Sequence, residues 1–301
     1  MQIDEQITFR KLEVFLTFME AGSMGRVAEM VGQSTVSVHR SLHSLEEALR
    51  CPLFRRDGRK LIPLAAAYAF AEHAARAVRA CVDGVDAARE AAGFTAARIR
   101  IGALYSLTVR TLPQLLMGLK TRRPDLDVDL TLGSNRDLLE KLRDARLDAI
   151  VIALDADVPH ADLVEVPMFD DEICFAAPLD SRYADRASVD LRDLRDEKFV
   201  TLSEDFATYH DFMYAFELAG FQPNIAMRVG DIFSLTNLVS GGVGYALLPR
   251  RVAEFSPQVQ FIPLDARYAT SQRITLLMPK NRERSPNLLA LSAECRMFRR
   301  R

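Results

Sequence analysis

The chain has 301 residues, a formal net charge of −2, and 49% apolar and 27% charged residues. This length allows two or three compact units, and the near-neutral charge excludes a protein that coats nucleic acid along its whole surface. No run approaches the roughly 18 apolar residues of a membrane span, and the N-terminus lacks the pattern of a signal peptide. The four cysteines have no metal-ligand spacing, which predicts reduced thiols in a cytoplasmic protein without membrane association.

Two short helices joined by a tight turn are predicted between Ser23 and Leu49, after a first helix that ends at Gly22. Ser23 and Ser34 are N-cap signals, and Gly32 is a stop signal between them. The second helix has one apolar stripe, formed by Val38, Leu42, Leu45 and Leu49. Its opposite side carries short hydroxyls, Arg and His, which suit the major groove of DNA. The pattern indicates a helix-turn-helix motif, although an ordinary surface hairpin of helices is the alternative on these residues alone.

A basic β-hairpin pattern follows the second helix, with Asp57-Gly58 at its tip. Six basic and three acidic residues lie between Arg40 and Lys60. A basic hairpin beside a recognition helix is the winged form of the motif, and the wing contacts phosphates or the minor groove. We predict DNA contacts from the recognition helix and the wing, through Ser34, Thr35, Val36, Ser37, His39, Arg40, His43, Arg55, Arg56 and Arg59. The two histidines have no third ligand at a suggestive spacing, so no metal site is predicted.

An alanine-rich segment without proline extends from about residue 64 to residue 92 and predicts a helix of roughly 40 Å. Mostly small side chains can form one row along this helix, the predicted seam, which consists of Phe70, Ala74, Ala77, Cys81, Val85 and Ala88. So long a helix with so little bulk is not expected in the core of a small domain, so we predict that it pairs with its twin from a second subunit. A solvent-exposed connector is the alternative, and Gly84 is a weak point in the helix.

Strands and helices alternate after residue 93, which predicts parallel sheets with helices on both faces. The predicted strands are 98–103, 128–132, 149–153, 173–177, 199–202, 226–229, 244–248, 260–263 and 273–278. The predicted helices are 112–119, 137–143, 211–219, 233–240 and 286–298. Strands 173–177 and 273–278 are expected to be paired crossovers between two lobes, which would then form a cleft for a small molecule.

Hydroxyl and amide groups follow several of these strands and precede helices, where ligands of such folds bind. We predict an effector site formed by Tyr105, Ser106, Ser134, Asn135, Thr201, Ser203, Thr208, Tyr209 and Phe233. Ser106, Ser134 and Thr208 lead this set, and a small dicarboxylate would suit such groups without any arginine. For each Ser or Thr, simple helix capping is the alternative. Asp231 would repel a dianion and is interpreted as structural.

The N-terminal third resembles the LysR-type transcriptional regulators. The resemblance is carried by segments 23–29 (SMGRVAE), 45–49 (LEEAL) and 53–59 (LFRRDGR), and similar runs continue at 112–116, 123–124, 147–150 and 241–249, so it covers essentially the whole chain. Ser34-Thr35-Val36 stands where the family usually has Ser-Gln-Pro, and His39 stands before Arg40 where the family often has Ser. A generic operator should therefore not be assumed. Ala145 stands where a Gly is frequent.

The resemblance implies an α/β chain with three parts: a winged helix-turn-helix over 1–63, a linker and dimerisation helix over 64–93, and a two-lobed effector domain over 94–301. That last domain would resemble periplasmic binding proteins, with lobe I over about 98–172 and 275–301 and lobe II over about 173–274. The implied partners are an inverted repeat of double-stranded DNA, a small carboxylate effector, RNA polymerase, and further copies in a homodimer or homotetramer. Segments 37–40, 104–108, 206–209 and 231–234 resemble the malonate-utilisation regulators of the family, which implies an activator with malonate as co-inducer and no other cofactor.

Other classes of function are weaker. The chain has no G-x-S-x-G, H-E-x-x-H, P-loop or strand-borne G-x-G-x-x-G motif, so we predict no enzyme and no catalytic residue. Segment 241–244 (GGVG) follows a helix and indicates tight packing rather than phosphate binding. The absent signal peptide and the winged motif disfavour a plain solute-binding protein. A regulator of another small-carboxylate pathway is the alternative that stays open.

Overall fold

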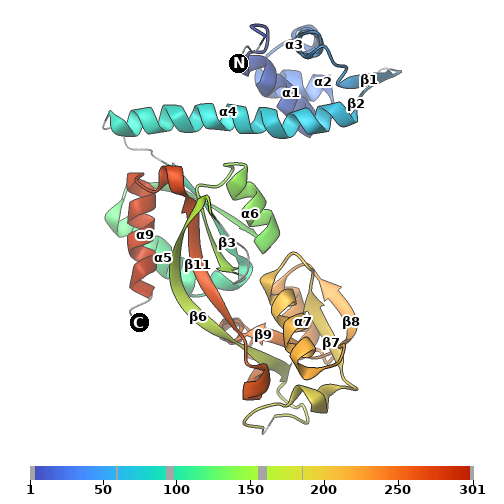
Figure 1. Cartoon of the computed structure of the whole chain (residues 1–301), viewed down its shortest axis with the longest axis vertical. Helices are drawn as coiled ribbons and strands as arrows, with labels where there is room; N and C mark the ends of the chain where they lie inside the picture. Colours follow the sequence, from blue (N-terminus) through green and yellow to red (C-terminus); the bar gives the residue numbers. More distant parts are fainter. Residues whose placement is uncertain (1–3, 59, 93–97, 155–160, 185, 299–301) are drawn as a thin grey trace. The chain divides into compact units, whose positions relative to one another are not determined.

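The computed structural model describes residues 4–58, 60–92, 98–154, 161–184 and 186–298. The chain divides into two compact units, Met1–Gly93 and Phe94–Arg301, and Figure 1 labels most of their helices and strands. Among the described helices, none is both long enough and apolar enough to cross a lipid bilayer.

The first unit consists of three helices, a hairpin and a long helix. They are α1 (Phe9–Ala21), α2 (Met24–Val31), α3 (Thr35–Leu49), β1 (Phe54–Asp57), β2 (Lys60–Pro63) and α4 (Ala65–Ala91). The predicted caps are confirmed: the hydroxyls of Ser23 and Ser34 accept hydrogen bonds from backbone N–H groups three residues on, and Gly22 and Gly32 end their helices in the left-handed conformation. The helix-turn-helix boundaries therefore follow from local sequence signals.

The core of the first unit joins α3 to the hairpin. Val38, Leu42 and Leu45 are buried, which confirms the predicted stripe. One carboxylate oxygen of Glu46 accepts hydrogen bonds from the backbone N–H groups of Leu53 (2.8 Å) and Phe54 (3.0 Å). The segment that leads into β1 is thereby attached to the recognition helix, so the wing is held in place by a charge-assisted contact as well as by packing.

Helix α4 has two different halves. Its first half packs on the core of its own unit through Ala67, Phe70, Ala74 and Val78. In its second half Val85 is 47% exposed, and Gly84 does not interrupt the helix. The expectation that α4 is not a core helix was therefore wrong for its first half, because α1 lies against α4, and in that half Ala74 of the predicted seam is buried and Phe70 is partly buried.

The second unit begins with lobe I elements β3 (Arg98–Leu104), η1 (Tyr105–Leu107), α5 (Thr111–Arg122), β4 (Asp127–Gly133), α6 (Asn135–Arg143) and β5 (Ala149–Leu154). Strand β6 (Leu163–Pro178) leads to η2 (Leu191–Leu194), β7 (Lys198–Leu202), α7 (Ala207–Ala219), β8 (Asn224–Val229), α8 (Ile232–Ser240), β9 (Ala246–Pro249), η3 (Arg250–Phe255), β10 (Val259–Pro263) and η4 (Ala266–Tyr268). Strand β11 (Ser271–Pro279), η5 (Lys280–Arg282) and α9 (Pro286–Phe298) complete it. Each predicted strand and helix has a counterpart in the structure, most with small shifts at their ends and one, β6, with a long extension.

The sheets are mixed, so the prediction of parallel sheets was only partly right. Strands β3, β4 and β5 are parallel, as are β7 and β8. Strand β11 runs antiparallel to β5 and β6, and β9 and β10 run antiparallel to β6. A short apolar run indicates a buried strand but carries no information about the direction of its neighbours.

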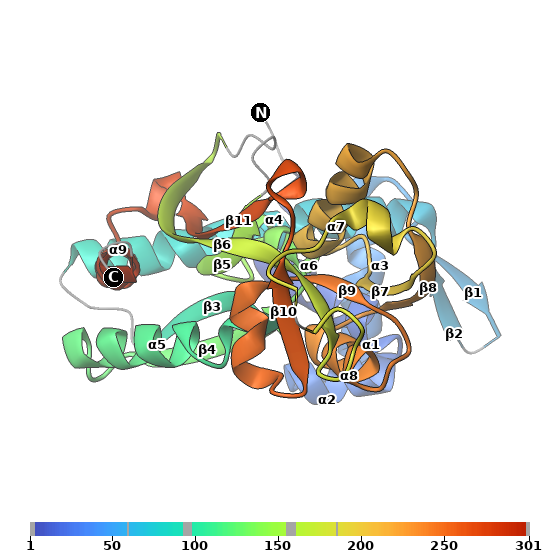
Figure 2. The same ribbon diagram turned by 90° about the horizontal axis from the view of Figure 1, so that it is seen from below.

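Strand β6 is much longer than predicted and links the two lobes (Figures 1 and 2). Its first half pairs with β11, and its second half pairs with β9 and β10. Residues 170–172 pair with 271–273, so the crossing lies just before the predicted segment 173–177. Pro167 hid the first half of the strand in the sequence, and the sheet accommodates it at an irregularity in register opposite Ile274 and Thr275.

Each lobe has its own core. That of lobe I draws on β3, β5, α5, α6, β11 and α9, and that of lobe II on β7, α7, α8 and the second half of β6. Segment 241–244 serves packing, as predicted: a Cβ on Gly244 would lie 2.8 Å from the carbonyl oxygen of Lys198 in β7. Gly242 has a φ of +73° and makes the turn.

Candidate functional site

The exposed side of α3 presents a mixed polar and apolar surface. Thr35, Val36, Ser37 and Arg40 are exposed, and Val36 keeps 66% of its surface accessible at the start of the helix. The hydroxyls of Ser34 and Ser37 lie 3.0 Å apart. Such a helix start can bring short side chains close to base edges, because these side chains are small and exposed.

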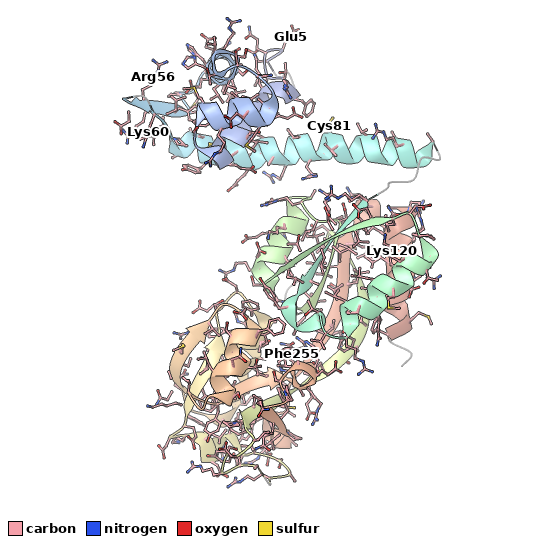
Figure 3. All side chains as sticks on the ribbon, turned by 180° about the vertical axis from the view of Figure 1, so that it is seen from behind. Glu5, Arg56, Lys60, Cys81, Lys120 and Phe255 are labelled. Atoms are coloured by element: carbon pink, nitrogen blue, oxygen red, sulfur yellow. The ribbon has the colours of Figure 1, made fainter. Side chains whose placement is uncertain are left out.

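The wing contacts this helix directly. A guanidinium nitrogen of Arg56 in β1 lies 2.7 Å from Nε2 of His39, so His39 accepts the hydrogen bond when that nitrogen is unprotonated. Beside this pair, a shallow groove of about 250 Å³ runs along α3 past Val36, Arg40 and His43. Arg56 and Lys60 project from the hairpin in Figure 3. The Arg56–His39 contact therefore links the exposed side of α3 to the first strand of the wing.

One hydroxyl of α3 has a structural role, and one predicted DNA contact is not described. The hydroxyl of Ser44 accepts a hydrogen bond from Nζ of Lys11 (2.6 Å) and donates one to Gln6 (3.1 Å). It therefore ties α3 to the N-terminal segment. Arg59 was predicted to contact DNA and lies outside the described residues. Across the described part of the chain, no group of three or more His, Cys, Asp or Glu side chains is arranged to hold a metal ion.

In the second unit, two helix N-termini meet where the lobes join. The side chain of Asn135, the first residue of α6, donates to the carbonyl of Ala153 (2.6 Å) and accepts from the backbone N–H of Ala207, the first residue of α7 (3.1 Å). Arg136 forms an ion pair of 2.7 Å with Asp205, also across the junction. Because each helix start carries partial positive charge, this region favours an anion.

A chain of hydrogen bonds connects the same lobes at a second place and is centred on Arg251 of η3. The guanidinium donates to the Ser106 hydroxyl (2.9 Å), the Asp171 carboxylate (2.8 Å) and the side-chain oxygen of Gln272 (2.8 Å). The Gln272 amide donates in turn to the hydroxyl of Thr208 (3.0 Å). Ser106 and Thr208, two leading candidates from the sequence, thus belong to one network.

This network is buried and charge-paired. Burial lowers the pKa of the Arg251 guanidinium, and the neighbouring Asp171 carboxylate acts against that decrease. Both side chains are only 10% exposed. The Gln272 amide also donates to Asp211 (2.6 Å), which brings a second carboxylate to the junction. The network therefore has polar groups for a ligand but little unopposed positive charge.

The remaining predicted effector residues are spread around this junction. The hydroxyl of Ser134 caps α6, and Thr201 is buried at the end of β7. Tyr105 packs against the core of lobe II, and the ring of Phe233 lies 4.8 Å from that of Phe255. The backbone of Ser203 bonds Val229, and Tyr209 is half-buried beside His210. Asp231 caps α8 through Ser234, which agrees with its structural interpretation.

Sequence reasoning missed Arg251, Gln272 and Asp171, and stated that a carboxylate could be bound without arginine. A signal was available for each of them. Arg251 lies two residues after the end of strand β9. Asp171 lies two residues before the first predicted crossover strand, and Gln272 lies directly before the second. Polar residues at the edges of crossovers come together because both crossovers pass the same junction.

Two family descriptions match the chain. Residues 9–67 match the bacterial regulatory helix-turn-helix protein, lysR family, and residues 92–299 match the LysR substrate binding domain. The malonate utilization transcriptional regulator of Klebsiella pneumoniae is 47% identical over 300 residues, which cover 99% of this chain and 97% of that protein. The transcriptional dual regulator GltC of Bacillus subtilis is 28% identical over 284 residues, 92% and 93% of the two chains.

Solved structures share the fold. Full-length CbnR in complex with its target DNA superposes with a TM-score of 0.73 at 23% identity, over 97% of this chain and all of that one. A full-length OxyR variant from Pseudomonas aeruginosa superposes with a TM-score of 0.70 at 22% identity, over 97% and 95% of the two chains. The arrangement of an N-terminal helix-turn-helix and a two-lobed α/β domain is therefore shared with these proteins.

Proposed function

The chain belongs to the LysR family of transcriptional regulators, and we propose that it controls genes of malonate use in response to malonate. Members of this family bind DNA and a small-molecule effector and are not enzymes. The 47% identity to a malonate utilization regulator supports the choice of effector. The observation that carries the proposal is the meeting of two helix N-termini, with hydroxyls from both lobes, at one junction.

Malonate binds at that junction and bridges the lobes. One carboxylate accepts hydrogen bonds at the start of α6 near Ser134, and the other does so at the start of α7 near Thr208. Ser106, held in place by Arg251, completes the site. The ion pair of Arg136 and Asp205 is largely exposed and worth little, so its guanidinium can turn to the ligand at low cost.

DNA is bound by the surface of α3 and the wing. Val36, Ser37 and Arg40 face base edges, and Arg55 and Arg56 contact phosphates. Two such units bind an inverted repeat when the chain dimerises, and the exposed apolar residues Val82 and Val85 of α4 supply part of the dimer contact. Malonate changes the angle between lobes and thereby the DNA bend and the contact with RNA polymerase.

The effector is tested by calorimetric titration of the full-length protein with malonate, succinate and oxalate in parallel. Of the three, malonate is expected to bind most tightly. Ser106→Ala and Thr208→Val should each lower the malonate affinity about tenfold, because a hydrogen bond to a charged group is lost. Ser240→Ala, at the exposed end of α8, is the matched control and should bind normally. Preference for succinate or oxalate would reassign the regulator to another small-carboxylate pathway, and no binding by any of them would refute a small dicarboxylate effector.

The DNA surface is tested with sites that the wild-type protein selects from a random duplex library. Arg40→Ala is expected to lower affinity about tenfold or more and to relax base preference. Arg56→Ala should lower the affinity for all DNA sequences alike and reduce the slope of log affinity against log salt concentration by about 1. Arg143→Ala in α6 is the matched control. If a folded Arg40→Ala variant lost malonate affinity as much as DNA affinity, the assignment of DNA binding and malonate binding to different residues would be contradicted.

A further inference from the structure

A cavity of about 190 Å³ lies beside η1, at the start of α5, and it shares only Ser106 and Arg251 of its lining with the network at the lobe junction. Its apolar wall is formed by Phe169 of β6 and Phe298 of α9, whose ring centroids are 6.5 Å apart. Its opposite wall carries the polar side chains of Thr111 and Gln114. We propose that this cavity is a second ligand site, specific for a monocarboxylate with a compact apolar or aromatic body.

The size of the cavity sets the size of the ligand. An apolar protein cavity of about 150 Å³ holds one benzene molecule. A cavity of about 190 Å³ therefore accepts a six-membered ring with a short carboxylate arm. Two phenylalanine rings tilted by 35° to each other offer such a ring a flat apolar contact. A ligand with no apolar body would leave this wall in contact with water.

The charges at the rim set the charge of the ligand. Arg110 forms an ion pair of 2.9 Å with Glu254 across the rim, and the two side chains are 69% and 36% exposed. Exposed pairs of this kind contribute little, so a ligand carboxylate can replace Glu254 as the partner of Arg110. The inner guanidinium, that of Arg251, is already neutralised by Asp171. The cavity thus presents one guanidinium, that of Arg110, to a ligand carboxylate, and the second charge of a dianion would be repelled by Glu254.

The local backbone reinforces this preference. Arg110 is the N-cap of α5, and its side chain makes no capping hydrogen bond within the described structure. The partial positive charge of the helix start therefore faces the rim together with the Arg110 guanidinium. Ser106 and Arg251 form the inner end of the cavity and also belong to the network that reaches Gln272. The two ligand sites therefore share these two residues, but the other residues that line the cavity are not part of the proposed malonate site.

The test is calorimetric titration of the full-length protein with phenylacetate, and with 2-phenylethanol as its neutral analogue. Phenylacetate is expected to bind with a Kd below about 1 mM, and the alcohol at least tenfold more weakly. Arg110→Met should weaken phenylacetate at least tenfold, and Phe298→Trp, which fills the cavity, should abolish binding. Arg143→Met is the matched control for the lost charge and should bind normally. Circular dichroism checks that each variant is folded.

Malonate distinguishes this site from the proposed effector site. Both Arg110→Met and Phe298→Trp should keep their malonate affinity within about twofold, and malonate should still bind to protein saturated with phenylacetate. Absence of saturable phenylacetate binding, equal binding of the alcohol, unchanged affinity in folded Arg110→Met, or displacement of phenylacetate by malonate would each overturn the proposal. Failure of malonate to bind at all would refute the proposed effector but not the second site.

Discussion

Replacing Arg251 by methionine is expected to destabilise the second unit by about 4 kcal/mol. Methionine keeps most of the apolar stem of arginine but removes the guanidinium. Among the described residues, the Asp171 carboxylate, 10% exposed, then keeps just the bond from the backbone N–H of residue 251 at 3.2 Å. Breaking a buried ion pair by removing one partner costs roughly 3–5 kcal/mol, because the remaining charge is uncompensated.

The neutral partners account for about half of that total. Ser106 and Gln272 each lose a donor at 2.8–2.9 Å, worth about 1 kcal/mol apiece where no water replaces it. The double variant Arg251→Met with Asp171→Asn removes both charges. We expect it to recover about half of the loss, which leaves a deficit of roughly 2 kcal/mol from the neutral partners.

The assay is urea unfolding followed by circular dichroism, because the chain contains no tryptophan. The four proteins of the cycle (wild type, both single variants and the double variant) are compared at pH 7. A single Arg251→Met variant within about 1 kcal/mol of wild type would refute a buried ion pair at the lobe junction. A double variant no more stable than Arg251→Met would show that the loss comes from shape rather than charge.

Two further variants test single features of the second unit by urea unfolding. Ala145→Gly should stabilise it by about 0.5–1 kcal/mol, because Ala145 has a φ of +52° and glycine has no Cβ to strain there. As a control, Ala290→Gly inside α9 should cost about 1 kcal/mol. Equal effects of the two substitutions would refute backbone strain at Ala145. Asp148→Asn should cost about 3 kcal/mol at pH 7, because Arg100 and Arg282 lose their shared carboxylate. Burial opposes ionisation of Asp148, but its hydrogen bonds with Arg100 prevail, so its pKa is lowered. The stability that the ionised Asp148 contributes is therefore present above about pH 4 and is lost as the pH falls through the lowered pKa. A difference between wild type and Asp148→Asn that grew on acidification would contradict this assignment.

The first unit was predictable because its signals are local. The Ser23 and Ser34 caps, the Gly22 and Gly32 stops and the stripe of Val38 and its neighbours act within one or two helical turns, so residue spacing alone specifies them. The role of Glu46 could not be derived in this way. Its carboxylate bonds backbone groups seven and eight residues away, and only the folded position of the wing creates that contact.

The second unit shows where such reasoning stops. Apolar runs identified its strands, but not that β6 continues through Pro167 or that β11 runs against β5. The predicted effector residues were chosen one at a time from strand ends. Arg251 was absent from that set, although it joins Ser106 to Gln272 and so to Thr208. Those residues are far apart in the chain, and no local pattern couples them.

The sequence by itself therefore determined the family, the helix-turn-helix with its basic wing, and the alternation of strands and helices. Each of these depends on short-range periodicity, capping and turn residues, which are encoded within a few positions. Only the tertiary structure decided the strand directions, the burial of the first half of α4, the junction of α6 and α7 and the cavity beside α5. These depend on which distant segments come into contact, because burial, charge pairing and cavity shape are properties of the packed chain.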